Sequence, residues 1–182
     1  RTAGETVLLP PGEYSFVVNR GPEYLPQRLN VTVGDKAEQT VVIDLKRWIH
    51  VAKRGWFSGD HHVHAAGCGH YDSPTEGVGP EAMMRHILGE DLNVGCVLTW
   101  GPCFDFQRRY FSPGADLVSE PTTIIKYDLE ISGFGSQALG HVCLLDLADQ
   151  TYPGSEGRSD IGWPTWTVPV LRWAKEQGGV TG

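Results

Sequence analysis

Alternating apolar and polar positions dominate the first 50 residues. In "ETVLLPPGEYSFVVN", a Pro-Pro-Gly turn is followed by Tyr14, Phe16 and Val18, which alternate with smaller or polar neighbours, as in a half-buried strand. The segments "QRLNVTV" and "EQTVVIDL", separated by a Gly-Asp turn, predict two more strands with a hairpin-like connection. Several short strands in succession predict a small β-sandwich-like module over residues 1–50, which packs on the rest of the chain.

From Trp48 onward the pattern changes to strands alternating with helices. The predicted strands are "GWFSGDHHVH", "NVGCVLTW", "TTIIKYDLEIS" and "GHVCLLDL", the predicted helices are "GPEAMMRHILGEDL" and "WTVPVLRWAKEQGG", and the closing "VTG" begins another strand. The nearly unbroken apolar run "NVGCVLTW" is typical of a strand buried on both faces. This alternation predicts an α/β domain over residues 51–182, with a parallel sheet or barrel whose chemistry lies at the carboxyl ends of the strands.

Composition and charge narrow the function classes only a little. The 182 residues are enough for a buried core, and the formal net charge of −7 gives no general attraction to nucleic acids or anionic membranes. We therefore expect neither nucleic acid nor a membrane as a partner, and no run of about 18 apolar residues predicts a membrane span. No secretion signal is visible in a chain that opens on Arg1, and the compartment and oligomeric state stay open.

Four cysteines are scattered along the chain without a Cys-x-x-Cys pair. They are Cys68, Cys96, Cys103 and Cys143. Four cysteines would allow a disulfide, but this spacing shows no framework, and a chain of this length does not need one. We expect mostly free thiols.

The densest chemical signal is the segment "GDHHVH". On a strand His62 and His64 share a face, and two neutral imidazoles so placed can reach one divalent ion. His61 points the other way, and Asp60 is predicted to lie on the face of the histidine pair and to orient an imidazole. The alternative is a set of ordinary exposed or hydrogen-bonded histidines, but the position, where a strand runs into a glycine-rich loop, favours a metal site.

Three further residues are candidates to complete that site. His70 lies in the loop after the histidine strand, Glu130 near the end of "IIKYDLE", and His141 at the start of the next strand. Each has an ordinary alternative role in a loop, at a strand end or in a surface ion pair, and their joint position at strand ends is what favours the metal site. His50, in a basic neighbourhood, and His86, within a helix, are discounted, and Cys68 is a weak candidate as a soft ligand.

With these residues in place, the chain resembles the PHP-type metallohydrolases, most closely their CehA/McbA-like branch. The similarity lies in "GWFSGDHHVH", in "PEAMMRHILGEDLNVG" leading into "CVLTW", and in "LEISGFGSQALGHVCLLDL". The resemblance implies a distorted (β/α) barrel with two or three divalent ions, usually zinc, manganese or iron. It also implies His62 and His64 as the opening ligand pair, Glu130 as a bridging carboxylate, His141 as a further ligand, and His70 as a looser match.

Two departures from that family pattern are visible. Where the family has Thr-Asp-His, this chain has Thr99-Trp100-Gly101, which lacks both the acid and the imidazole. The later Asp-x-His ligands are also not present, and residues 51–182 are too few for a seven-stranded barrel. We therefore expect a fragment with an incomplete PHP-type barrel.

The expected function is metal-dependent hydrolysis of a small-molecule phosphoester or a related ester or carbamate. The metal ligands would be His62, His64, Glu130 and His141, while His70 would bind a second ion or act as an acid, and Asp60 would orient an imidazole. Two alternatives stay open: a catalytically dead metal-binding or interaction module, and a structural β-rich protein with incidental histidines.

Overall fold

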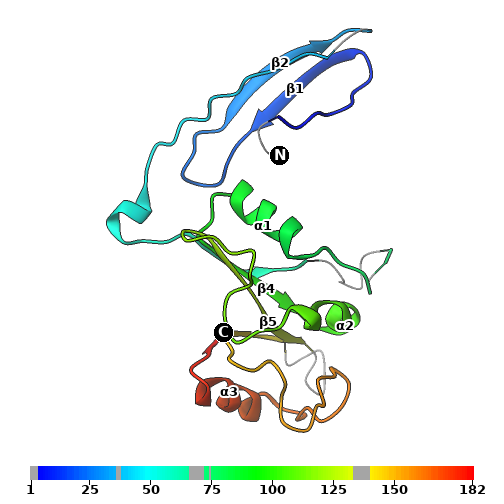
Figure 1. Cartoon of the computed structure of the whole chain (residues 1–182), viewed down its shortest axis with the longest axis vertical. Coiled ribbons are helices and arrows are strands. Elements are labelled where there is room, and N and C mark those ends of the chain that lie inside the picture. The colour runs from blue at the N-terminus through cyan, green and yellow to red at the C-terminus, as the bar shows by residue number, and fades with distance from the viewer. Residues whose placement is uncertain (1–3, 36–37, 66–71, 74, 133–139) are drawn as a thin grey trace.

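The computed structural model describes residues 4–35, 38–65, 72–73, 75–132 and 140–182, and it shows a mixed α/β protein with two sheets (Figure 1). The smaller sheet pairs β1 (Gly12–Val18) with β2 (Gln27–Val33) in antiparallel register. The larger is a curled half-barrel of five strands. They are, in spatial order, β3 (Gly59–Val63), β4 (Val94–Thr99), β5 (Ile124–Ser132), β6 (His141–Leu145) and β7 (Val180–Thr181).

The large sheet is parallel only in its first three strands. β3 pairs with β4 and β4 with β5 in parallel, whereas β6 runs antiparallel to both β5 and β7. The expectation of a parallel sheet is therefore correct for β3–β5 and wrong for β6. Because β6 runs the opposite way, its first residue pairs with the last residue of β5, His141 with Ser132.

Helices cover one face of this sheet. Met83, Met84 and Ile87 of α1 (Pro80–Gly89) pack on Ile125 and Tyr127. A second cluster joins α3 (Thr167–Glu176) to the far half of the sheet; its buried members are Phe104, Leu129, Ile131, Val142, Leu144, Leu147, Val170 and Ala174. The same face is thus apolar along β5 and β6, which leaves the opposite face for polar side chains.

Short helical turns complete the fold. Val51–Arg54 forms the 3₁₀ turn η1 before β3, and the residues after β4 form η2 (Gly101–Cys103), α2 (Phe104–Gln107) and η3 (Arg108–Tyr110). The sequence pattern did not predict these turns. Within the described ranges, no helix has the length and apolar character needed to cross a bilayer.

The described part of residues 1–50 forms two strands and not the three predicted. Residues 38–45 form no strand in the part of the chain that the structure describes; the nearest pairing is a single bridge between Tyr24 and Arg47. Adjacent apolar residues in this segment stay exposed, with Val42 88% accessible. The β-propensity of "TVVI" is not realised because no neighbouring surface covers it.

An arginine joins the small sheet to the α/β unit. The Arg47 guanidinium donates to the carboxylates of Glu23 and Asp91 and to the Tyr24 hydroxyl, and it stacks 4.4 Å from the centre of the Tyr24 ring. Arg20 adds a second ion pair to Asp91 at 3.3 Å. Burial is the largest single influence on the pKa of Arg47 and acts to lower it. The hydrogen bonds to Asp91 and Tyr24 together outweigh burial and raise the pKa, so the guanidinium stays charged.

Gly21 lies at the same joint and is needed there for two reasons. Its φ is +65°, and a Cβ on this residue would lie 1.9 Å from the backbone oxygen of Glu90. Gly55 has a similar φ of +81° but nothing within 4 Å of its Cβ position. Substitution of Gly55 would therefore introduce backbone strain alone, whereas substitution of Gly21 would introduce backbone strain and a collision.

We expect Gly21→Ala to destabilise the protein clearly more than Gly55→Ala. Gly55→Ala should lower the free energy of unfolding by about 1 kcal/mol, the cost of placing an L-residue in the left-handed region. Gly21→Ala adds a collision with backbone and should cost several kcal/mol, measured by urea denaturation of both variants and the wild type. Equal losses in the two variants would contradict the close packing at Glu90.

Candidate metal centre

The polar face of the half-barrel carries side chains from three strands at one edge. On each strand the intervening residues are apolar and packed toward the helices: Val63 and Ala65 beside the histidine pair, Leu129 and Ile131 beside Glu130, and Val142 and Leu144 in β6. Because successive side chains point to opposite faces, these anchors turn His62, His64, Glu130, His141 and Cys143 to the same side. The apolar core therefore positions the site.

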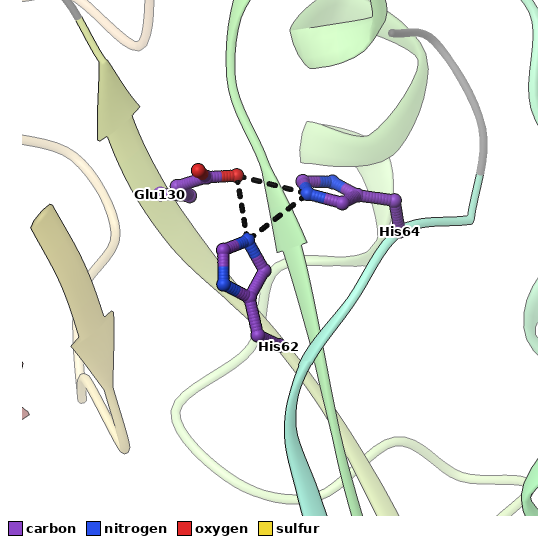
Figure 2. A group of neighbouring side chains, drawn as sticks. All are labelled: His62, His64 and Glu130. Atoms are coloured by element: carbon purple, nitrogen blue, oxygen red, sulfur yellow. Dashed lines mark hydrogen bonds and ion pairs between the residues drawn. The ribbon is translucent and has the colours of Figure 1, made fainter. Parts of the chain in front are cut away.

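Three ligand atoms converge there, as Figure 2 shows. Nε2 of His62 lies 3.0 Å and Nε2 of His64 2.9 Å from Oε2 of Glu130, and the two nitrogens are 3.1 Å apart. This group of one carboxylate and two imidazoles could hold a metal ion. The structure thus brings together three of the four metal ligands predicted from the sequence around one point.

The carboxylate lies at the bottom of the site and the imidazoles lie at its rim. The Glu130 side chain is 7% exposed, whereas those of His62 and His64 are 35% and 41% exposed. Burial acts to raise the pKa of Glu130, but hydrogen bonds with His141 and His62 and the nearby charges of His62 and His64 outweigh it and lower the pKa below its ordinary value of 4.5. Glu130 is therefore an anion at neutral pH, and the more exposed imidazoles lie between it and the solvent.

His141 contacts the same carboxylate on its other oxygen. Its Nδ1 is hydrogen-bonded to Oε1 of Glu130, and its side chain is 64% exposed. The antiparallel direction of β6 produces this contact, because it brings the start of β6 to the end of β5. The role of His141 as a metal ligand stays a prediction; what the structure adds is its place beside Oε1 and not among the three converging atoms.

The two residues predicted to take part in catalysis have different outcomes. Asp60 accepts a hydrogen bond from the backbone N–H of His62 at 3.0 Å, so this contact orients the strand and not an imidazole. One extra residue enters β3 between Asp60 and Val63, so alternation alone does not decide which face Asp60 shares, and its role in orienting an imidazole stays a prediction. His70, like Cys68, lies outside the described residues.

The end of β4 is aromatic where the family pattern would place Asp-His. The Trp100 ring makes edge contacts with Phe104 at 5.6 Å and with Trp163 at 4.9 Å between ring centres. Gly101 then turns the chain with a φ of +62°. This position therefore contributes to a packed aromatic cluster with Tyr152 and Trp163.

One contact in the site was missed by the sequence reasoning. Cys143 is the register partner of Glu130, and its Sγ lies 3.7 Å from Nδ1 of His62. Burial and the charge of Glu130 raise the pKa of this thiol. The signal was available, because Cys143 is two residues from His141 and strand alternation places both on one face. Cys96 and Cys143 are free thiols.

Comparison with known proteins adds no relative to this description. Neither the family models, nor the curated proteins, nor the solved structures contain a match to the chain. The fold and the site therefore define the protein only as a mixed α/β half-barrel with a candidate divalent-cation centre of two histidines and one glutamate.

The lowered pKa of Glu130 predicts an acid-dependent loss of stability. A carboxyl whose folded-state pKa is lowered stabilises the fold above its unfolded value, and this contribution is lost as the pH falls through the folded value. In metal-free protein, the free energy of unfolding of the wild type should therefore exceed that of Glu130→Gln above the ordinary value of 4.5, and the difference should shrink as the pH falls further below 4.5.

Urea denaturation at stepped pH measures this difference. Glu176→Gln, which removes an exposed carboxylate at the end of α3, is the control and should show a nearly constant difference from the wild type. A Glu130→Gln difference that is equally flat between about pH 6 and pH 3, to within about 0.5 kcal/mol, would contradict the stabilised carboxylate.

Proposed function

We propose that His62, His64 and Glu130 hold a divalent metal ion. His141, which contacts the other oxygen of Glu130, is proposed as a further metal ligand. In this proposal the protein carrying the site is a metal-dependent hydrolase of small-molecule phosphoesters or related esters and carbamates. The observation that carries the metal site is the convergence of two imidazole nitrogens and one carboxylate oxygen, 2.9–3.1 Å apart, from two strands.

The spacing of these atoms supports a shared cation. Ligand atoms about 2.0–2.2 Å from a metal lie about 3 Å apart when they occupy adjacent positions on one side of it. Two histidines and one carboxylate on one face, with the remaining positions open, are a donor set suited to iron, and imidazole also suits zinc. Zinc, manganese and iron are the ions that we propose.

Without a cation, the same geometry is poorly satisfied. When both imidazoles are neutral, each carries one N–H, and both Nε2 atoms can pair with the single Oε2 of Glu130 only if both donate to it while lying 3.1 Å from each other. Two donors at that separation repel. A cation replaces both protons with one positive charge that three lone pairs can share.

The surrounding sheet supports a hydrolase of the barrel type. β3, β4 and β5 are parallel, and the donor atoms lie near the carboxyl ends of β3 and β5, where (β/α) barrels hold their active sites. The resemblance to the PHP-type metallohydrolases predicts the same placement. We infer that the half-barrel is part of such a barrel, preceded by the small antiparallel sheet.

In the proposed site, the buried and the exposed residues would have different roles. A bound divalent ion lowers the pKa of a coordinated water toward about 7 and polarises an ester or phosphoryl oxygen. The buried Glu130 fixes the site on the sheet and supplies the negative charge, while the exposed edges of His62 and His64 leave the solvent side accessible to a substrate. Asp60 holds the backbone of the histidine strand in place.

Stoichiometric metal binding should disappear when the two imidazoles are removed. We expect about one equivalent of zinc, manganese or iron in the wild type and its loss in His62→Ala/His64→Ala, measured by elemental analysis. At a free zinc concentration about 100 times the dissociation constant, the wild type should gain about 2.7 kcal/mol, a rise in melting temperature of about 5–10 °C that the double variant lacks.

His61→Ala is the matched control for this experiment. His61 is an exposed neighbour in the same strand and does not belong to the converging group. It should keep both the metal content and the zinc-dependent rise. Retention of the rise in His62→Ala/His64→Ala, or less than about 0.2 equivalents of any transition metal in the wild type, would rule out this centre.

A second candidate function is a metal-binding module without turnover. Trp100 favours it, because the ring takes the place of the family's Asp-His and is committed to packing against Phe104 and Trp163. The two candidates make the same prediction for metal content and opposite predictions for catalysis.

Hydrolysis assays on metal-loaded protein separate the two candidates. A hydrolase should release nitrophenol from bis(4-nitrophenyl) phosphate or 4-nitrophenyl acetate, with a rate that falls at least about 100-fold in Glu130→Gln. Binding of one metal equivalent with no rate above that of Glu130→Gln on either substrate would instead establish the binding module.

A further inference from the structure

His62 is held on three sides, and only one of them faces the proposed cation. Its Nε2 points to Glu130 and His64, its backbone N–H donates to Asp60, and its Nδ1 lies 3.7 Å from Sγ of Cys143. A ligand imidazole needs a partner for its second nitrogen, since that partner fixes the ring orientation and decides which nitrogen carries the proton. Cys143 is the side chain in that place.

We propose that Cys143 is a positioning residue for the metal centre, which receives the Nδ1–H of His62 so that the Nε2 lone pair faces the cation. This inference rests on the proposed metal site and deepens it. It assigns a role to a thiol that lies outside the converging group of His62, His64 and Glu130.

The thiol suits this place because it can act in both directions. A cysteine S–H is a weak donor and its sulfur a weak acceptor. With a cation at Nε2, His62 carries its proton on Nδ1 and donates to Sγ. Without a cation, the tautomer with its proton on Nε2 donates to Glu130, and the S–H can donate to Nδ1. Rotation of one S–H bond therefore gives Nδ1 of His62 a partner in both states.

Strand pairing fixes Cys143 beside the ring. Cys143 is opposite Glu130 in the β5–β6 register, and its neighbours Val142 and Leu144 are anchored in the apolar core. The backbone of Cys143 is therefore fixed beside His62. Its sulfur faces Nδ1, whereas the converging ligand atoms are those of His62, His64 and Glu130, which sets Cys143 apart from the ligands.

Metal affinity of Cys143→Ala against Cys96→Ala tests the proposal. Cys96 is a free thiol of intermediate exposure on β4, and it provides a matched cysteine in the same sheet. Zinc dissociation constants are measured by competition with a chromogenic chelator. Loss of a partner to a ligand histidine typically weakens binding about 10–100-fold, so we expect at least a 10-fold increase in the constant for Cys143→Ala alone. A smaller increase overturns the proposal.

Cys143→Ser distinguishes the hydrogen bond from the volume of the side chain. The hydroxyl also donates and accepts, so this variant should bind zinc more tightly than Cys143→Ala. A loss in Cys143→Ser as large as in Cys143→Ala would mean that packing alone holds the ring, and it would overturn the proposal. The serine variant also serves if Cys143→Ala does not fold, since it must then bind within about 10-fold of Cys96→Ala.

A cobalt spectrum separates positioning from ligation. Cobalt-loaded wild type should lack the near-ultraviolet charge-transfer band of a thiolate ligand, and that band would overturn the positioning role. Failure of this inference is distinguishable from failure of the proposed function. If wild type binds no metal, the centre itself is wrong; if wild type and Cys143→Ala bind equally, only the role of Cys143 is wrong.

Discussion

The buried carboxylate of Glu130 is the group around which the polar face is organised. A carboxylate removed from water costs several kcal/mol unless cations or hydrogen-bond donors surround it, and here they arrive from two other strands. His62 and His64 approach one oxygen and His141 the other. This demand links β3, which is distant in sequence, with the consecutive strands β5 and β6.

The antiparallel direction of β6 is what brings His141 to the Glu130 carboxylate. A parallel strand in its place would put His141 at the opposite edge of the sheet, about five residues' rise from Glu130. The antiparallel return places His141 and Cys143 beside Glu130 and His62, while Val142 and Leu144 close the core on the other face. One reversal of direction thus supplies a partner for the second carboxylate oxygen and a partner for the second nitrogen of His62.

Local pattern predicted most of the large sheet, both main helices and the three residues whose side chains converge. Apolar runs predicted β4 and β5, the spacing of His62 and His64 predicted a shared face, and the strand-end position predicted Glu130, because those features depend on the chain's own periodicity. The third strand at 38–45 was wrong because strand formation there requires a covering surface that the sequence does not reveal. The direction of β6 and the extra residue in β3 depend on pairing between distant segments, which a single sequence does not record.

The joint between the two sheets is made of charges and not of a shared apolar core. Arg47 connects Glu23 and Tyr24 on one side with Asp91 on the other, and Arg20 reinforces Asp91. The contact between the two parts depends on a few side chains. Neither buried cluster of the α/β unit contains a residue of the small sheet. A change in the N-terminal hairpin therefore reaches the α/β unit through a few residues, Arg20, Gly21 and Arg47, and not through the apolar core beneath the candidate metal centre.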